Sequence, residues 1–173
     1  FGIDSTLVKP GDMGALAAAV RPETRLIFTE SPTNPHLHVL DLVQLVAFAK
    51  ERRLKVLIDS TLVTPVNQRP LDFGVDLVIH SATKYMGGHN DLMAGVVCGS
   101  APLVDAIREY QRITGAVVDP HTSYLLIRGL KTMALRVERQ NESAQAIAEF
   151  LERHHQIKKV WYPGLPSHPD HAI

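Results

Sequence analysis

The chain has 173 residues, 45% of them hydrophobic, which is enough for the core of one domain but thin for two. Eighteen Lys and Arg balance eighteen Asp and Glu, so the charge predicts neither a nucleic-acid partner nor an anionic membrane surface. No apolar run reaches the length of a membrane span, and Cys98 alone cannot form an internal disulfide. We therefore expect a soluble globular protein in the cytoplasm.

The two ends do not resemble the ends of a complete fold. There is no initiator Met, and residues 1–6 have the pattern of a passage from strand to turn. Residues 167–173 follow directly on a proline-rich turn. We expect the sequence to be an internal piece of a longer chain.

The first two thirds of the chain alternate helical and extended patterns. Helices are predicted over residues 12–20, with Asp12 as the N-cap, and over residues 41–52, which start acidic and end basic. Continuous apolar runs predict strands buried on both faces, at residues 26–28, 56–58, 77–79 and 94–98. Together these patterns predict an α/β fold with a largely parallel sheet.

Helical patterns dominate after residue 100. A helix is predicted over residues 103–113, and a helical stretch over residues 121–155 is so long that we expect a break near Gly129. Residues 158–162 have the pattern of a strand, and we expect that strand to open a second domain.

Residues 76–91 bring several chemically useful side chains to the end of a buried strand. Ligands in open α/β sheets bind beyond the carboxyl ends of the strands, and Ser81, Thr83 and Lys84 are expected there. In an extended segment the two hydroxyls project to the same side and could donate to one phosphate. Lys84 is a candidate amine nucleophile for an aldehyde, the alternative being an ordinary surface lysine beside a glycine turn.

Asp59 ends another predicted buried strand. A carboxylate there is costly unless it faces a cation or several donors, and a pyridinium nitrogen is one candidate. The alternative is that Asp59 caps a helix that follows residues 60–61. A lysine, two hydroxyls and an acid at the same edge of the sheet favour a site.

These segments resemble a known family. SATKYMGGHND (81–91), ESPTNP (30–35) and the strand ending at Asp59 are similar to the Cys/Met-metabolism family of pyridoxal-phosphate enzymes, which has the aminotransferase-like fold. The resemblance continues through residues 124–141 and 162–171. It implies part of the large cofactor domain at residues 1–120, a helical connector at 121–156, and the start of the small C-terminal domain at 157–173.

The resemblance also implies roles for single residues. Lys84 would bind pyridoxal phosphate as a Schiff base, and Asp59 would pair with the pyridine nitrogen. Ser81 and Thr83 would bind the phosphate, and Asn34 would lie near the phenolic oxygen. The family usually has Asn where this chain has Ser60.

Within the family, residues 87–95 and 58–68 are most similar to the cystathionine γ-synthases of plants and cyanobacteria. This implies replacement of the γ-substituent of an O-acyl-homoserine by cysteine, in a homo-oligomer that we expect to be a tetramer. The alternative in the same family is γ-elimination by a cystathionine or methionine lyase. An alternative of another class is a non-catalytic binding or scaffold piece.

The histidines at residues 154, 155, 168 and 171 invite a metal interpretation. His154 and His155 are neighbours on a predicted helix and therefore face different ways, while the other two flank a proline turn. We expect no metal site.

Overall fold

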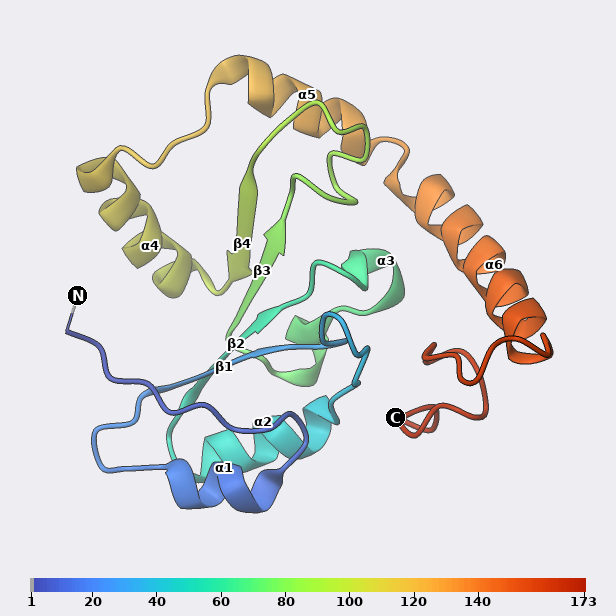
Figure 1. Cartoon of the computed structure of the whole chain (residues 1–173). Coiled ribbons are helices and arrows are strands. Elements are labelled where there is room, and N and C mark those ends of the chain that lie inside the picture. Colours follow the sequence, from blue (N-terminus) through green and yellow to red (C-terminus); the bar gives the residue numbers. More distant parts are fainter. Residues whose placement is uncertain (1) are drawn as a thin grey trace.

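The computed structural model describes residues 2–173, and a four-stranded sheet organises its N-terminal part (Figure 1). The strands lie in the order of the sequence, β1 (Leu26–Glu30), β2 (Lys55–Asp59), β3 (Leu77–Ser81) and β4 (Gly95–Gly99). The first three run parallel, and β4 runs antiparallel to β3. The predicted α/β fold with a mostly parallel sheet is confirmed, and all four apolar runs form strands.

The reversed direction of β4 was not predicted. A parallel neighbour needs a crossover long enough to return the chain to its starting edge, usually with a helix. Residues 82–94 form only turns and a loop, so the chain comes straight back alongside β3, with Ser81 opposite Gly95.

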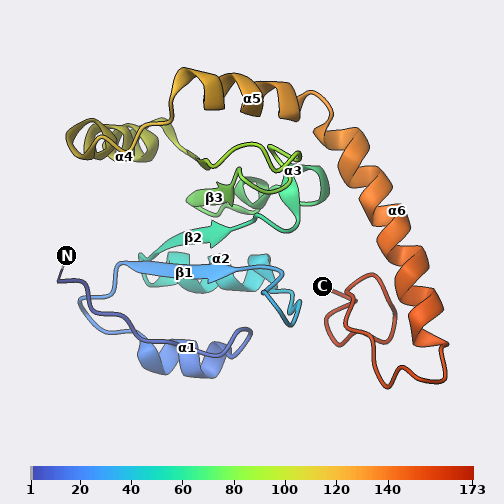
Figure 2. The same cartoon turned by 45° about the horizontal axis from the view of Figure 1, so that its top comes forward.

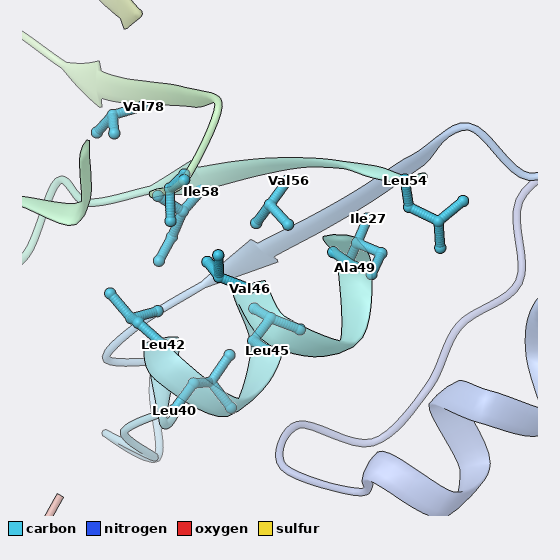
Figure 3. Close-up of a cluster of buried hydrophobic side chains, with 11 residues drawn as sticks. Ile27, Leu40, Leu42, Leu45, Val46, Ala49, Leu54, Val56, Ile58 and Val78 are labelled. Atoms are coloured by element: carbon cyan, nitrogen blue, oxygen red, sulfur yellow. The ribbon is translucent and has the colours of Figure 1, made fainter. Parts of the chain in front are cut away.

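Helix α2 (Leu42–Glu51) packs against one face of the sheet and closes the main core. Asp41 caps the helix through a hydrogen bond from the amide of Gln44, at 2.9 Å. The helix points its apolar side chains at those of β1, β2 and β3 (Figure 3). Ile58 lies at the centre of this cluster and is 0% exposed.

The expectation that the strands are buried on both faces is wrong for β1 and also for β4, none of whose residues is buried. Ile27 is buried, but its neighbours Leu26 and Phe28 point the other way and are exposed. The reason is that α2 packs against only one face of the sheet. Helix α1 (Met13–Ala19) is capped by Asp12 as predicted, and none of its residues is buried.

Two short helices after β2 were not predicted. They are α3 (Thr64–Asn67) and the 3₁₀ helix η1 (Pro70–Phe73), each with a proline in its first turn. Four residues are too few for a periodic hydrophobic pattern, so the sequence gives little signal for them.

The C-terminal part is a curved succession of helices beside the sheet (Figures 1 and 2). Helix α4 spans Ala101–Thr114, α5 spans Pro120–Leu130 and α6 spans Met133–Glu152. The predicted break near Gly129 is confirmed, because Lys131 and Thr132 separate α5 from α6. The proposed boundaries at residues 120 and 156 remain a prediction.

The prediction of a strand at residues 158–162 is wrong. A strand needs a neighbour for its backbone hydrogen bonds, and the segment has none within residues 2–173. It is instead part of an irregular C-terminal segment. That segment is tied to the loop after β1 further along, where the Asp170 carboxylate accepts from the amide of Val39, at 3.0 Å. No helix among the described residues is both long and apolar enough to cross a membrane.

Candidate functional site

The carboxylate of Asp59 is fixed by the residue two positions further along the chain. Its Oδ1 accepts from the amide of Thr61 at 2.9 Å and from the Thr61 hydroxyl at 2.6 Å. Its Oδ2 has no hydrogen-bond partner within residues 2–173, so one oxygen is held in place while the other can accept from a ligand. The N-cap alternative is wrong, because α3 begins later, with Val63 as its N-cap.

Thr61 links the ends of two strands. Its hydroxyl donates to Asp59 and accepts from the amide of Ser81, with oxygen and nitrogen 2.7 Å apart. The end of β2 is thereby joined to the end of β3, where the candidate lysine follows. Sequence reasoning gave Thr61 no role, although a hydroxyl two residues after an Asp is a common turn pattern.

Lys84 lies in a tight turn that starts where β3 ends. Its amide donates to the Ser81 carbonyl at 3.0 Å, and its carbonyl accepts from the amide of Gly88 at 2.7 Å. A further bond runs from the amide of Gly87 to the carbonyl of Ala82, at 2.8 Å. The backbone around Lys84 is therefore well defined, while its side chain is exposed in the described chain. Exposure alone leaves both interpretations of this lysine open.

The two candidate phosphate-binding hydroxyls are placed differently from expectation. Only Ser81 belongs to the strand, and Thr83 is in the turn, so the two do not share an extended segment. The Thr83 hydroxyl accepts from the amide of Ala94 at 3.1 Å and donates weakly to its carbonyl at 3.4 Å. The Ser81 hydroxyl makes no hydrogen bond within the described residues. Phosphate binding by both stays a prediction.

Asn34 lies in the exposed loop after β1, at the same edge of the sheet as Asp59. Glu30, the last residue of β1, is directly opposite Asp59, and its carboxylate accepts from the backbone amide of Asn34 at 3.1 Å. No hydrogen bond within the described part of the chain joins Asn34 to Asp59 or Lys84. A role for its side chain beside a ligand remains a prediction.

A buried histidine that sequence reasoning missed lies beneath this edge. His80 is 6% exposed, and burial lowers its pKa from the ordinary value of 6.5. The nearby Asp59 carboxylate and the backbone of Ser60 oppose that shift. Ser60 is fully buried, and its hydroxyl finds no partner in the described chain.

The site thus combines a carboxylate with one free oxygen, a primary amine and a free hydroxyl, joined through Thr61 and the backbone. This set suits a ligand with a ring N–H, an aldehyde and a phosphate. The described residues contain no cluster of three or more His, Cys, Asp or Glu that could hold a metal ion.

Comparison with known proteins agrees with this chemistry. Residues 1–173 match the model of the family described as Cys/Met metabolism PLP-dependent enzyme. The chain is 49% identical to cystathionine γ-synthase 1, chloroplastic, of Arabidopsis thaliana over all of its length and 31% of that protein. It is 46% identical to L-methionine γ-lyase of Pseudomonas putida, again over all of its length and 44% of that protein.

A solved structure is similar as well. Cystathionine γ-lyase from Lactobacillus plantarum, complexed with L-serine, superposes with a TM-score of 0.92 at 40% identity. The match covers 96% of this chain and 44% of that one. The chain therefore spans about a third to under a half of the length of these relatives.

Proposed function

Because the chain belongs to the Cys/Met-metabolism family of PLP-dependent enzymes, we propose that the full-length protein binds pyridoxal phosphate at Lys84 and acts on sulfur amino acids. The favoured reaction replaces the γ-substituent of an O-acyl-homoserine with cysteine and gives cystathionine. The observation that carries the proposal is the link from Asp59 through Thr61 to the strand end before Lys84.

The proposal assigns each residue a task. The free Asp59 oxygen accepts from the protonated ring nitrogen, and the Ser81 hydroxyl donates to the phosphate. The Thr83 hydroxyl also donates to the phosphate, because its proton can turn away from the Ala94 carbonyl, to which it donates only weakly. Asn34 lies beside the phenolic oxygen.

When bound, pyridoxal phosphate supplies the electron sink that makes the substrate α-proton acidic. The protein supplies the base. The Lys84 amine would move a proton from the substrate α carbon to the cofactor and would then remove one from the β carbon, so that the γ-substituent can leave. It would return a proton to the β carbon once cysteine has added. Asp59 keeps the ring nitrogen protonated, which is possible because Thr61 prevents the carboxylate from turning away.

A second candidate in the same family is γ-elimination. It is favoured by the 46% identity to a methionine γ-lyase and by the 40% identity to a structurally similar cystathionine γ-lyase. Preference for the synthase rests on residues 58–68 and 87–95 and on the 49% identity to the Arabidopsis protein.

The same proposal covers assembly and location. We expect a homotetramer, supported by the exposed apolar side chains on α5 and α6 that an assembly could cover, such as Ile127 and Phe150. We also expect a cytoplasmic location, which rests on Cys98 as the only cysteine in the sequence. The Arabidopsis relative is described as chloroplastic, so localisation needs its own experiment.

Replacing the lysine tests the cofactor assignment. In the full-length protein, Lys84→Ala should remove the visible absorption band and lower activity by several orders of magnitude, because the covalent attachment and the base are both lost. Lys158→Ala, at an exposed lysine in the C-terminal loop, is the matched control. A Lys84→Ala protein that still traps the cofactor on borohydride reduction would refute the assignment. A wild-type protein without any cofactor band would favour the scaffold alternative.

The reaction is tested by supplying an O-acyl-homoserine with and without cysteine. A synthase should form cystathionine when cysteine is present and should release little 2-oxobutyrate from that product. Rapid consumption of cystathionine with release of cysteine and 2-oxobutyrate would instead establish the lyase.

A further inference from the structure

The junction between α5 and α6 packs directly on the turn that carries Lys84. Gly129, near the end of α5, is buried, and a Cβ added to it would lie 2.3 Å from the Gly87 carbonyl oxygen and 2.8 Å from that of Met86. Only glycine allows this approach. Figures 1 and 2 both show the loop between β3 and β4 beside this junction.

Arg136, in the first turn of α6, bridges the two segments. Its Nη1 donates to the Tyr85 carbonyl and its Nη2 donates to the Gly129 carbonyl, both at 2.9 Å. Its Nε donates to the Thr132 hydroxyl at 3.2 Å. A side chain at Gly88 would collide with this guanidinium, because a Cβ there would lie 2.2 Å from Nη1.

We propose that Arg136 is a positioning residue for Lys84. It holds the carbonyl of the residue directly after the lysine and ties the turn to the α5–α6 junction. This inference rests on the proposed role of Lys84. Its physical basis is that a reacting amine must keep its place relative to the substrate, and a displacement of about 1 Å can lower the rate about a hundredfold.

The geometry requires arginine rather than any cation. The guanidinium is planar and presents separate N–H groups to two carbonyls from different segments. Lysine keeps the charge but donates from a single nitrogen, so it cannot reproduce both bonds along with the bond to Thr132. Arg136→Lys should therefore behave more like Arg136→Ala than like the wild type.

The control lies on the same helix. Arg139 is exposed, and within residues 2–173 its guanidinium pairs with Glu142 alone, at 3.2 Å, and with no residue of the turn. Arg139→Ala and Arg139→Lys remove the same side chain from α6 without touching the turn. They report the effect of the substitution on the helix itself.

Hydrogen exchange of the full-length protein without cofactor is the first measurement. In Arg136→Ala and Arg136→Lys, the amides of Gly87 and Gly88 should exchange about tenfold faster than in the wild type, because the turn opens more often. The Arg139 variants should leave these rates unchanged. This measurement does not depend on activity.

Steady-state kinetics of the cofactor-loaded enzyme is the second measurement. The Arg136 variants should lose about 10- to 100-fold in kcat with KM changed by less than about threefold, since substrate contacts remain while the amine is misplaced. Unchanged exchange and a kcat within about twofold of the matching Arg139 variant would overturn the proposal. Should Arg136→Ala fail to accumulate, Arg136→Lys decides by the same two measurements.

Lys84→Ala separates this inference from the proposed function. If Lys84→Ala retains activity, the proposed function fails, and a role of Arg136 in positioning that lysine fails with it. If Lys84→Ala is inactive while the Arg136 variants match their controls, only the present inference fails.

Discussion

The sheet and the C-terminal helices differ in how they obtain their cores. The main cluster of buried side chains lies between residues 27 and 78 and is shared by α2 and three strands. In contrast, α4 has no buried residue, α5 buries only Gly129, and α6 buries Val137 and Ala148. The core of the sheet is therefore formed by side chains that lie close together in the sequence. The C-terminal helices instead carry apolar side chains that stay exposed among the described residues. The candidate site lies at the end of the well-packed part.

The largest effect should come from separating the chain from the rest of the protein. Residues 1–173 produced alone should be inactive and should associate, because exposed apolar side chains such as Ile113, Ile127 and Phe150 favour aggregation. The chain also spans only 31% of its Arabidopsis relative and 44% of the Pseudomonas one. Light scattering and an activity assay against the full-length protein test this, and a soluble, monomeric, active product would contradict it.

Replacing Asp59 tests the part of the site that lies at the end of strand β2. Asp59→Asn should bind some cofactor but lower kcat about a hundredfold or more, because the neutral amide no longer favours a proton on the ring nitrogen. The loss should appear in kcat rather than in KM. The control is Asp72→Asn, an exposed carboxylate on η1 that pairs with Arg69. Equal turnover in the Asp59 and Asp72 variants would exclude the proposed role.

Replacing one isoleucine in the sheet and one on α6 compares how much each region contributes to stability. Ile58→Ala should cost roughly 2–5 kcal/mol of unfolding free energy, because Ile58 is 0% exposed in the main core. Ile147 on α6 is 58% exposed in this chain, so Ile147→Ala should cost less unfolding free energy than Ile58→Ala, even where an assembly covers part of α6. Urea unfolding of the full-length variants measures both. Equal costs would show that α6 carries a core as important as that of the sheet.

Prediction from the sequence was most accurate for the features that depend on residues close together in the chain. The strands and α2 followed from local apolar patterns, and Asp12 caps its helix as expected, whereas Asp41 was predicted to lie inside α2 and caps it instead. The break between α5 and α6 was predicted because one uninterrupted helix over residues 121–155 would be unusually long. The same local logic identified the strand ends that carry Asp59 and Lys84.

What depends on distant partners could not be predicted in the same way. The segment 158–162 has a strand-like composition but no neighbouring strand in residues 2–173. Arg136 is one of several basic residues on a helical stretch, and only the folded chain shows that it reaches Tyr85, 51 positions earlier. Thr61 likewise gains its meaning from the amide of Ser81 on the next strand.

The smallest expected effect concerns pH and the buried His80. Burial lowers the pKa of this imidazole below its ordinary value of 6.5, and the charge of Asp59 reduces that shift without cancelling it. Below about pH 6.5 the unfolded chain therefore binds more protons at this position than the folded protein does. Stability rises with pH wherever the unfolded state binds more protons, so His80 should weaken the fold as the pH falls through this range.

Urea midpoints of the cofactor-free, full-length protein at pH 7.5 and 5.5 measure this effect. His80→Gln removes the titratable imidazole, so the stability of this variant should fall less between the two pH values than that of the wild type, whatever its stability at pH 7.5. The comparison of pH dependence matters because replacing a buried side chain has its own cost. His121→Gln, which removes an exposed imidazole on α5, is the control. An equal or steeper loss in His80→Gln would show that the charge of Asp59 stabilises the protonated imidazole more than burial disfavours it.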